Sequence, residues 1–113
     1  MVNRKVYGLL GLAEKAGKVA AGEFSCEKQL QSGKARLVLL AADASENSKK
    51  KFRDKAAFRS LPCLELDSKE ELGRTIGKQE RTCAVVLDAG FAAAIQKAYS
   101  AETSGPTEEA VKG

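Results

Sequence analysis

The chain has 113 residues, of which 43% are hydrophobic, and this is enough for one domain with a single packed core. It carries 19 Lys and Arg against 15 Asp and Glu, and it contains no histidine. The absence of histidine removes the usual general base near neutral pH and the commonest metal ligand, which argues against hydrolases and zinc enzymes.

The first third of the sequence predicts a helix, a short strand and a second helix. The first helix has apolar residues at helical spacing and a stop signal at Gly17. Residues 19–21 form a short strand that turns at Gly22 into a helix over residues 24–32, which Gly33 can end in the left-handed conformation.

The middle of the chain predicts a buried strand followed by a basic helix. Residues 37–42 (LVLLAA) are too short and too apolar for a surface element and are typical of a strand buried on both faces. Asp43 and Ser45 offer caps for a helix over residues 46–58. The outer side of this helix is expected to carry a basic run: Lys49, Lys50, Lys51, Arg53 and Lys55.

The last third predicts two more strand and helix pairs. After Pro62, residues 63–66 form a strand, and a capping box of Ser68 with Glu71 opens a helix that Gly77 closes. Residues 83–87 (CAVVL) form another buried strand. Gly90 opens the last helix, over residues 91–99, with an apolar inner face.

Helices and strands therefore alternate throughout, which indicates an α/β protein in the form of a three-layer α/β/α sandwich. Residues 1–99 form the single domain. Residues 100–113 (SAETSGPTEEAVKG) lack the apolar residues needed to offset the entropy of ordering them, so we expect a disordered tail. Without this tail, the domain holds 18 basic and 12 acidic side chains, a balance that favours polyanionic partners through counterion release.

The cysteines and glycines give no catalytic or cofactor site. Cys26, Cys63 and Cys83 are an odd number without a CxxC pair, and their apolar settings favour buried thiols in a reducing compartment. Gly8 and Gly11 lie within a helix pattern and form no phosphate-binding loop. We expect no enzyme activity, no cofactor and no metal.

Membrane association is also not expected. No apolar run reaches the about 18 residues that a spanning helix needs, and the first residues lack the pattern of a signal peptide. The expectation is a cytoplasmic monomer.

The turn at Gly22 is the sharpest candidate for a binding site. There the segment GEFSCEK enters the second helix, whose amino-terminal amides suit phosphates or base edges, and Lys28 can project beside them. An ordinary strand-to-helix turn explains the same residues, and a solvated helix face explains the lysine run.

Three ordered segments carry a family resemblance: KVAAGEFSCEKQLQSGKARLVLLAADAS, LPCLELDSKEELGRTIGK and AVVLDAGFAAAI. Over residues 4–99 the sequence resembles the kink-turn RNA-binding ribosomal proteins, the family of the archaeal L7Ae and eukaryotic L30e proteins, and within it the short bacterial YlxQ-like branch. The resemblance implies a mixed sheet and binding, at one end, to RNA bent at tandem sheared G·A pairs.

The family signature implies which residues would contact that RNA. The signature has a glycine, a polar pair that meets the guanines, and a lysine. Gly22 and Lys28 match it, whereas the polar pair falls on Phe24 and Ser25. Phe24 can stack on a base but cannot hydrogen-bond a guanine edge, and Ser25 is shorter than the family's Glu or Gln.

A second contact implied by the family is the loop after the fourth helix, which here has a phosphate-contacting composition. Lys34 and Arg36 could extend the same face, although solvation alone also explains them. The complete expected RNA-binding set is Gly22, Glu23, Phe24, Ser25, Lys28, Lys34, Arg36, Lys78, Gln79 and Arg81.

Three functions of different classes remain open from the sequence. The favoured one is a non-catalytic, ribosome-associated protein that binds structured RNA, with ribosomal RNA among the candidates. The second is a protein-interaction module in translation or transcription that uses Phe24 as an anchor. The third, an α/β enzyme for a small phosphorylated ligand, lacks both a histidine and a Gly-rich phosphate loop.

Overall fold

The computed structural model describes the backbone of residues 4–112 and the side chains of residues 4–101. Its elements alternate as the sequence predicts. In chain order they are α1 (Arg4–Lys15), β1 (Val19–Ala21), α2 (Glu23–Gln31), β2 (Leu37–Ala41), α3 (Glu46–Phe58), β3 (Cys63–Leu66), α4 (Lys69–Thr75), β4 (Cys83–Val86) and α5 (Ala89–Lys112).

The four strands form one mixed sheet in the order β1-β4-β2-β3. β2 and β3 run parallel, joined by α3, whereas β4 runs antiparallel to both of its neighbours, β1 and β2. Every residue of β2 and β4 is buried, as expected for central strands covered on both faces.

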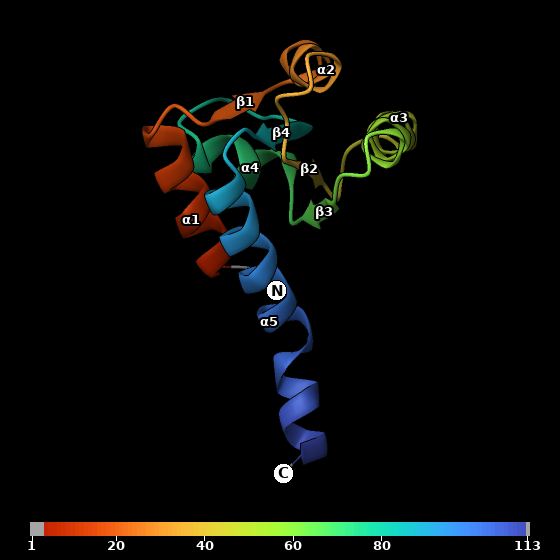
Figure 1. The fold of residues 1–113 in the computed structure, drawn as a ribbon. Helices are drawn as coiled ribbons and strands as arrows, with labels where there is room; N and C mark the ends of the chain where they lie inside the picture. Colours follow the sequence, from red (N-terminus) through yellow and green to blue (C-terminus); the bar gives the residue numbers. More distant parts are fainter. Residues whose placement is uncertain (1–3, 113) are drawn as a thin grey trace.

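Two apolar cores lie on opposite faces of this sheet, because side chains alternate along β2. Leu37, Leu39 and Ala41 pack with α1, α4 and α5. Val38 and Leu40 pack with α2 and α3. Figure 1 shows α1 and α5 side by side on one face and α2 and α3 on the other, so the three-layer α/β/α sandwich is confirmed.

Local sequence signals set most helix boundaries. The hydroxyls of Ser45 and Ser68 accept the N–H groups of Ser48 and Glu71 at 3.1 and 3.0 Å, which are the expected amino-terminal caps of α3 and α4. The three predicted stops, Gly17, Gly33 and Gly77, each have a positive φ between 72° and 78°.

α5 differs from the prediction at both ends. It begins at Ala89, before Gly90, because Asp88 is its cap: the Phe91 N–H donates to Asp88 Oδ2 at 2.9 Å. Its backbone continues to Lys112, while the side chains from residue 102 onward lie outside the described residues. The domain boundary at residue 99 and the disorder of residues 100–113 therefore stay predictions.

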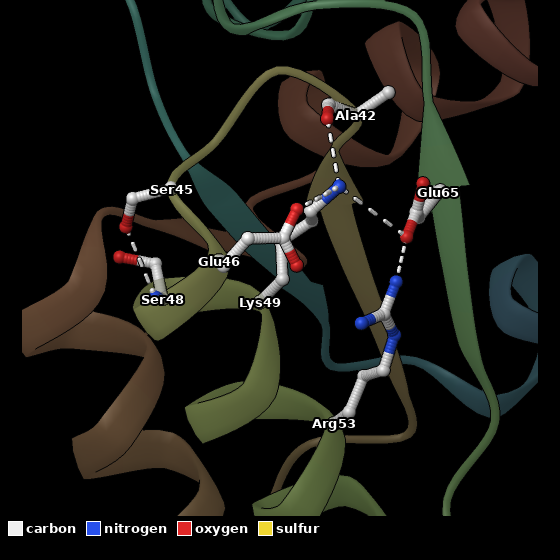
Figure 2. A network of polar contacts seen from close by, with 7 residues as sticks. All are labelled: Ala42, Ser45, Glu46, Ser48, Lys49, Arg53 and Glu65. Carbon is white, nitrogen blue, oxygen red and sulfur yellow. Dashed lines mark hydrogen bonds and ion pairs between the residues drawn. The ribbon is translucent and has the colours of Figure 1, made fainter.

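The basic run of α3 is not a free outer face, and the prediction was wrong for Lys49. Only 9% of Lys49 is exposed, and its Nζ donates to the Ala42 carbonyl at 2.9 Å, with Glu46 and Glu65 carboxylates at 3.6 and 3.8 Å. Figure 2 shows this network, in which Arg53 also binds Glu65. A lysine in the first turn can reach back over the preceding loop, so Lys49 fastens α3 to β2 and β3.

Candidate nucleic-acid interface

The topology brings two of the predicted binding segments together at one end of the sheet. The turn between β1 and α2 holds Gly22, whose N–H donates to the Cys83 carbonyl at 3.0 Å. Gly22 has φ 92°, a conformation that side chains rarely adopt, and a Cβ there would lie 3.8 Å from Arg81 Nε. The Arg81 side chain thus lies directly against the backbone at the start of α2.

The amino terminus of α2 differs from those of α3 and α4. Its N-cap is Gly22, which supplies no side-chain cap, whereas Ser45 and Ser68 cap the other two helices. The first N–H groups of a helix have no partner within the helix, and the helix dipole makes them favourable for negative charge. The amides at the start of α2 are therefore available to a phosphate or a base edge.

Two exposed side chains flank this terminus on a single face of α2. Phe24 is 80% exposed, although most large apolar side chains of the chain are buried. Lys28 is exposed as well and follows Phe24 by four residues, which places both on the same side of the helix. We call Gly22, Phe24, Ser25, Lys28 and Arg81 the α2-terminal surface.

Glu23 has a different position from its neighbours in the expected set. Its Oε2 accepts hydrogen bonds from the Ser48 hydroxyl at 2.6 Å and from the Thr82 hydroxyl at 3.4 Å. Lys51 Nζ lies 3.9 Å from Oε1. The carboxylate therefore fastens α2 to α3 and to the start of β4, so Glu23 positions the α2-terminal surface.

The loop of residues 77–82 holds Arg81 in place. Gly77 ends α4 with φ 72°, and the Lys78 N–H donates to the Gly73 carbonyl at 2.8 Å. The Arg81 N–H donates to the Lys69 carbonyl at 3.1 Å, and its Nη1 donates to the Glu80 carbonyl at 2.9 Å. Lys78 and Gln79 are exposed beside it, so this loop presents polar and cationic groups next to α2.

Gly73 makes this loop conformation possible, although it is not among the residues that the sequence predicts for the site. A Cβ on Gly73 would lie 2.0 Å from the Gln79 carbonyl oxygen, a distance that side chains do not tolerate. A glycine inside a well-capped helix costs stability unless packing requires it, and that was the available signal.

Lys34 and Arg36 are not brought to this end. The Arg36 N–H donates to the Val86 carbonyl at 2.7 Å, while the Gly22 N–H binds Cys83 at the other end of β4. Lys34 and Arg36 thus lie beyond the carboxyl end of α2, separated from Gly22 by the length of that helix. Their contribution to RNA binding stays a prediction, but the structure does not join them to the α2-terminal surface.

The thiols beneath the α2-terminal surface belong to the core. Cys26 and Cys83 are fully buried, and a hydrogen bond with Cys83, together with burial, raises the pKa of the Cys26 thiol. Burial also raises the pKa of Cys63, which is partly covered. Thiols with raised pKa values are poor nucleophiles, in agreement with the predicted core role of Cys26 and Cys63. The hydrogen bond with Cys26 lowers the pKa of Cys83, but this thiol is fully buried, which also agrees with a core role.

Two lysines of α3 form ion pairs with nearby carboxylates. Lys51 pairs with Glu27, and Lys50 pairs with Asp54 at 2.9 Å. Lys28, Lys78 and Arg81 have no ion pair among the described residues, so they are the cations that a ligand can reach here. Within residues 4–101, no group of three or more metal-ligating side chains gathers, and no described helix is long and apolar enough to cross a membrane.

Comparison with known proteins places this geometry in a family. The model of the ribosomal protein L7Ae/L30e/S12e/Gadd45 family matches residues 4–96. The RNA-binding protein YlxQ of Bacillus subtilis is 44% identical over 86 residues, which cover 76% of this chain and 86% of that protein. The RNA-binding protein YlxQ of Enterococcus faecium is 43% identical over 89 residues, covering 79% and 85% of the two chains.

Two solved structures share the fold. A protein of unknown function from Bacillus halodurans C superposes with a TM-score of 0.80 and 38% identity, covering 83% of this chain and 95% of that one. The 15.5kD RNA binding protein of Giardia lamblia gives a TM-score of 0.69 at 22% identity, covering 83% and 84%. The second likeness concerns the fold alone, and the resemblance predicted from the sequence is confirmed.

Proposed function

The chain belongs to the ribosomal protein L7Ae/L30e/S12e/Gadd45 family, and on this basis we propose that it is a non-catalytic protein that binds structured RNA. Two relatives above 40% identity are named RNA-binding proteins. The α2-terminal surface is the contact that we assign to the RNA.

One observation carries this assignment: the uncapped start of α2 lies against the Arg81 side chain. The Arg81 guanidinium nitrogen Nε lies 3.8 Å from the position that a Cβ on Gly22 would take. It is therefore next to the free backbone amides at the start of α2. Amides at a helix amino terminus and a bidentate cation both recognise phosphate oxygens. A bent RNA backbone offers closely spaced phosphates, which suits this convergence.

Phe24 and Ser25 determine how the α2-terminal surface contacts the bases of the RNA. A phenyl ring has no hydrogen-bonding group, so Phe24 contributes stacking on an unpaired base. Ser25 can reach a base edge only at short range. We therefore propose a kink-turn or a related bent RNA as the ligand, bound through phosphates and stacking more than through guanine edges.

The setting of this binding is also a proposal. We propose a cytoplasmic monomer associated with the ribosome, with ribosomal RNA as the ligand to test first. Crosslinking of bound RNA in cells followed by sequencing identifies the ligand, and equilibrium sedimentation of the purified chain measures the oligomeric state.

The direct test measures the affinity for an RNA containing a kink-turn by fluorescence anisotropy, across a series of salt concentrations. Replacing both Lys28 and Arg81 by Ala is expected to weaken binding at least about tenfold and to lower the salt slope by about 1 for each phosphate that is no longer neutralised. Phe24→Ala is expected to weaken binding about 5- to 100-fold with the salt slope unchanged, because stacking releases no counterions.

The matched control is Lys97→Ala, an exposed lysine on α5 at the opposite layer of the sandwich, which should leave the affinity within about twofold. Equal binding by the wild type and the Lys28 and Arg81 double variant would refute the site. Equal binding to a straight duplex would refute the preference for bent RNA.

A protein-interaction module remains the second candidate, because Phe24 is 80% exposed. A partner protein that is captured after nuclease treatment and lost in Phe24→Ala would favour this candidate. Loss of capture on nuclease treatment favours RNA.

A further inference from the structure

A second cationic surface lies at the end of the sheet opposite Gly22, where β1, β2 and β3 begin. Each of these strands is preceded by a cation within four residues: Lys18, Arg36 and Arg59. Lys18 and Arg36 bracket β4, since the Leu87 N–H donates to the Lys18 carbonyl and the Arg36 N–H donates to the Val86 carbonyl. The cations thus gather here because the strands start at this edge.

Arg36 and Arg59 line a single pocket of about 200 Å³, although they come from different loops. The remaining wall is apolar, apart from Gly33, and includes Leu30 and Leu61. Arg36 has no ion pair among the described residues, and Arg59 uses one N–H to bind the Gln31 carbonyl at 3.2 Å. Among residues 4–101 no carboxylate lines the pocket, so its two guanidinium groups remain available to an anion.

A second, larger pocket of about 330 Å³ adjoins the first, with Leu30 and Arg59 in both walls. It lies between α2 and α3, and its rim carries Phe58, which is 83% exposed. The Arg59 guanidinium lies 5.7 Å from the centre of the Phe58 ring. An exposed ring beside an arginine is a stacking platform for an unpaired base.

The two acidic residues that line this larger pocket, Glu27 and Asp54, are each paired with a lysine. Glu27 binds Lys51, and the hydrogen bond from Lys51 lowers the pKa of the Glu27 carboxyl. Asp54 binds Lys50 at 2.9 Å. Lys55 also lines the pocket, so the balance of charge over the two pockets is positive.

We propose that these two pockets form a second RNA site, which takes a single-stranded segment with a phosphate between Arg36 and Arg59 and a base against Phe58. We call Arg36, Phe58 and Arg59, which line these pockets, the strand-start surface. This second site goes beyond the proposed function, because it lies at the opposite end of the molecule. It rests on the proposed function in one respect, which is that the anionic ligand is RNA.

The two surfaces are too far apart to share one phosphate group. α2 has 9 residues and separates them by about 13 Å, since a helix rises about 1.5 Å per residue. One RNA would therefore have to continue past α2 from its bent region, or two RNA segments would be held together. In either case the strand-start surface binds single strands, whereas the α2-terminal surface binds the bend.

The test uses an eight-nucleotide single-stranded RNA of mixed sequence, titrated into the full chain alone and into the chain saturated with the kink-turn RNA. Replacing both Arg36 and Arg59 by Ala should weaken binding of the single strand at least about tenfold and lower its salt slope by about 0.7, because the one phosphate between them is no longer neutralised. Phe58→Ala should weaken it about 5- to 100-fold at an unchanged slope. Arg36 and Arg59 are both exposed, so the double variant is expected to fold, and its thermal unfolding curve checks this.

The controls separate this proposal from the proposed function. The Lys28 and Arg81 double variant should keep single-strand binding within about twofold while it loses the kink-turn RNA. If the kink-turn RNA fails to bind but the single strand depends on Arg36 and Arg59, the proposed function fails and this inference stands.

Four outcomes overturn the inference. Single-strand affinity could be unchanged in all the strand-start variants, or it could depend on Lys28 and Arg81 instead. A nuclease-resistant protein partner that requires Phe58 would assign the surface to a protein. Binding of free AMP as tight as that of the oligonucleotide would make the ligand a nucleotide and not an RNA strand.

Discussion

The substitution Gly73→Ala has two opposite effects on the free energy of unfolding: a gain in helix propensity and a steric clash with the loop of residues 77–82. In an exposed helix, Gly→Ala stabilises by about 1 kcal/mol because alanine loses less backbone entropy. At Gly73 the new Cβ would instead lie 2.0 Å from the Gln79 oxygen and 2.6 Å from its carbon, against an ordinary contact of 3.4 Å or more. The loop of residues 77–82 would have to move away by more than about 1 Å.

This movement has a cost that exceeds the gain in helix propensity. Overpacking against a backbone costs about 1–3 kcal/mol. A displaced loop also weakens the bond from the Arg81 N–H to the Lys69 carbonyl, worth about 1 kcal/mol. The net expectation is a loss of about 1–3 kcal/mol in the free energy of unfolding, or at least about 4 °C in Tm.

Urea unfolding and RNA titration on the same sample measure both consequences. Affinity for the kink-turn RNA should fall together with stability, because the displaced loop carries Arg81 away from Gly22. The matched control is Gly8→Ala in α1, where a Cβ meets nothing within 4 Å, so a gain of up to about 1 kcal/mol is expected. A Gly73→Ala protein stabilised as much as the Gly8→Ala protein would refute the reasoning.

Three further changes test the packing around the site. Burial raises the pKa of Tyr7 to about 12, against the opposite effect of the Asp67 N–H, which donates to its hydroxyl at 3.0 Å. Burial thus makes the neutral phenol the form that the fold stabilises, and stability should fall as pH rises from about 10 to about 12. Tyr7→Phe should remove this alkaline loss and lower stability near neutral pH by about 1 kcal/mol, as measured by urea unfolding at several pH values. Ser68→Ala should cost about 1 kcal/mol through the lost cap of α4, and Ser68→Asp should cost less; equal losses would contradict a capping role. Lys49→Met should cost about 1–2 kcal/mol, whereas Lys50→Met, on an exposed pair, should change calorimetric stability by less than about 0.5 kcal/mol.

The sequence was sufficient where the controlling interactions are local. Ser45 and Ser68 cap helices through bonds to residues three positions away, and Gly77 ends α4 through its own backbone conformation. The burial of β2 on both faces also follows from a run of five apolar residues. These signals lie within one or two turns of the chain, so no knowledge of the tertiary structure was needed.

The sequence was not sufficient where a side chain finds its partner at long range. Lys49 has the composition of an exposed lysine, and only the arrival of β3 brings Glu65 to it. The sequence could not show that Ser48 and Thr82, 25 and 59 residues away, hydrogen-bond the Glu23 carboxylate, and the RNA contact of Glu23 stays a prediction. Lys34 and Arg36 were assigned to the same face as Gly22, and the strand register places them at the opposite end.

The direction of β4 explains both cationic surfaces. α2 and α3 each follow a strand, so they start at the end where β1 and β2 finish. Because β4 is antiparallel to these strands, with Ala21 opposite Ala84 and Leu40 opposite Cys83, it begins at that same end and delivers Arg81 to the start of α2. A parallel β4 would have carried Arg81 to the other edge, away from Gly22.

The same reversal leaves the opposite edge to the residues that precede β1, β2 and β3. There Val86 is paired with Val19 on one side and with Leu37 on the other, so the preceding Lys18 and Arg36 lie on either side of the end of β4. A register shift of one residue would exchange the two faces of β4, and each of its buried side chains would then have to pack into the opposite core, so the register is strongly fixed. The separation of the two cationic surfaces is therefore a rigid property of the sheet, and an RNA that contacts both must adapt its own path to it.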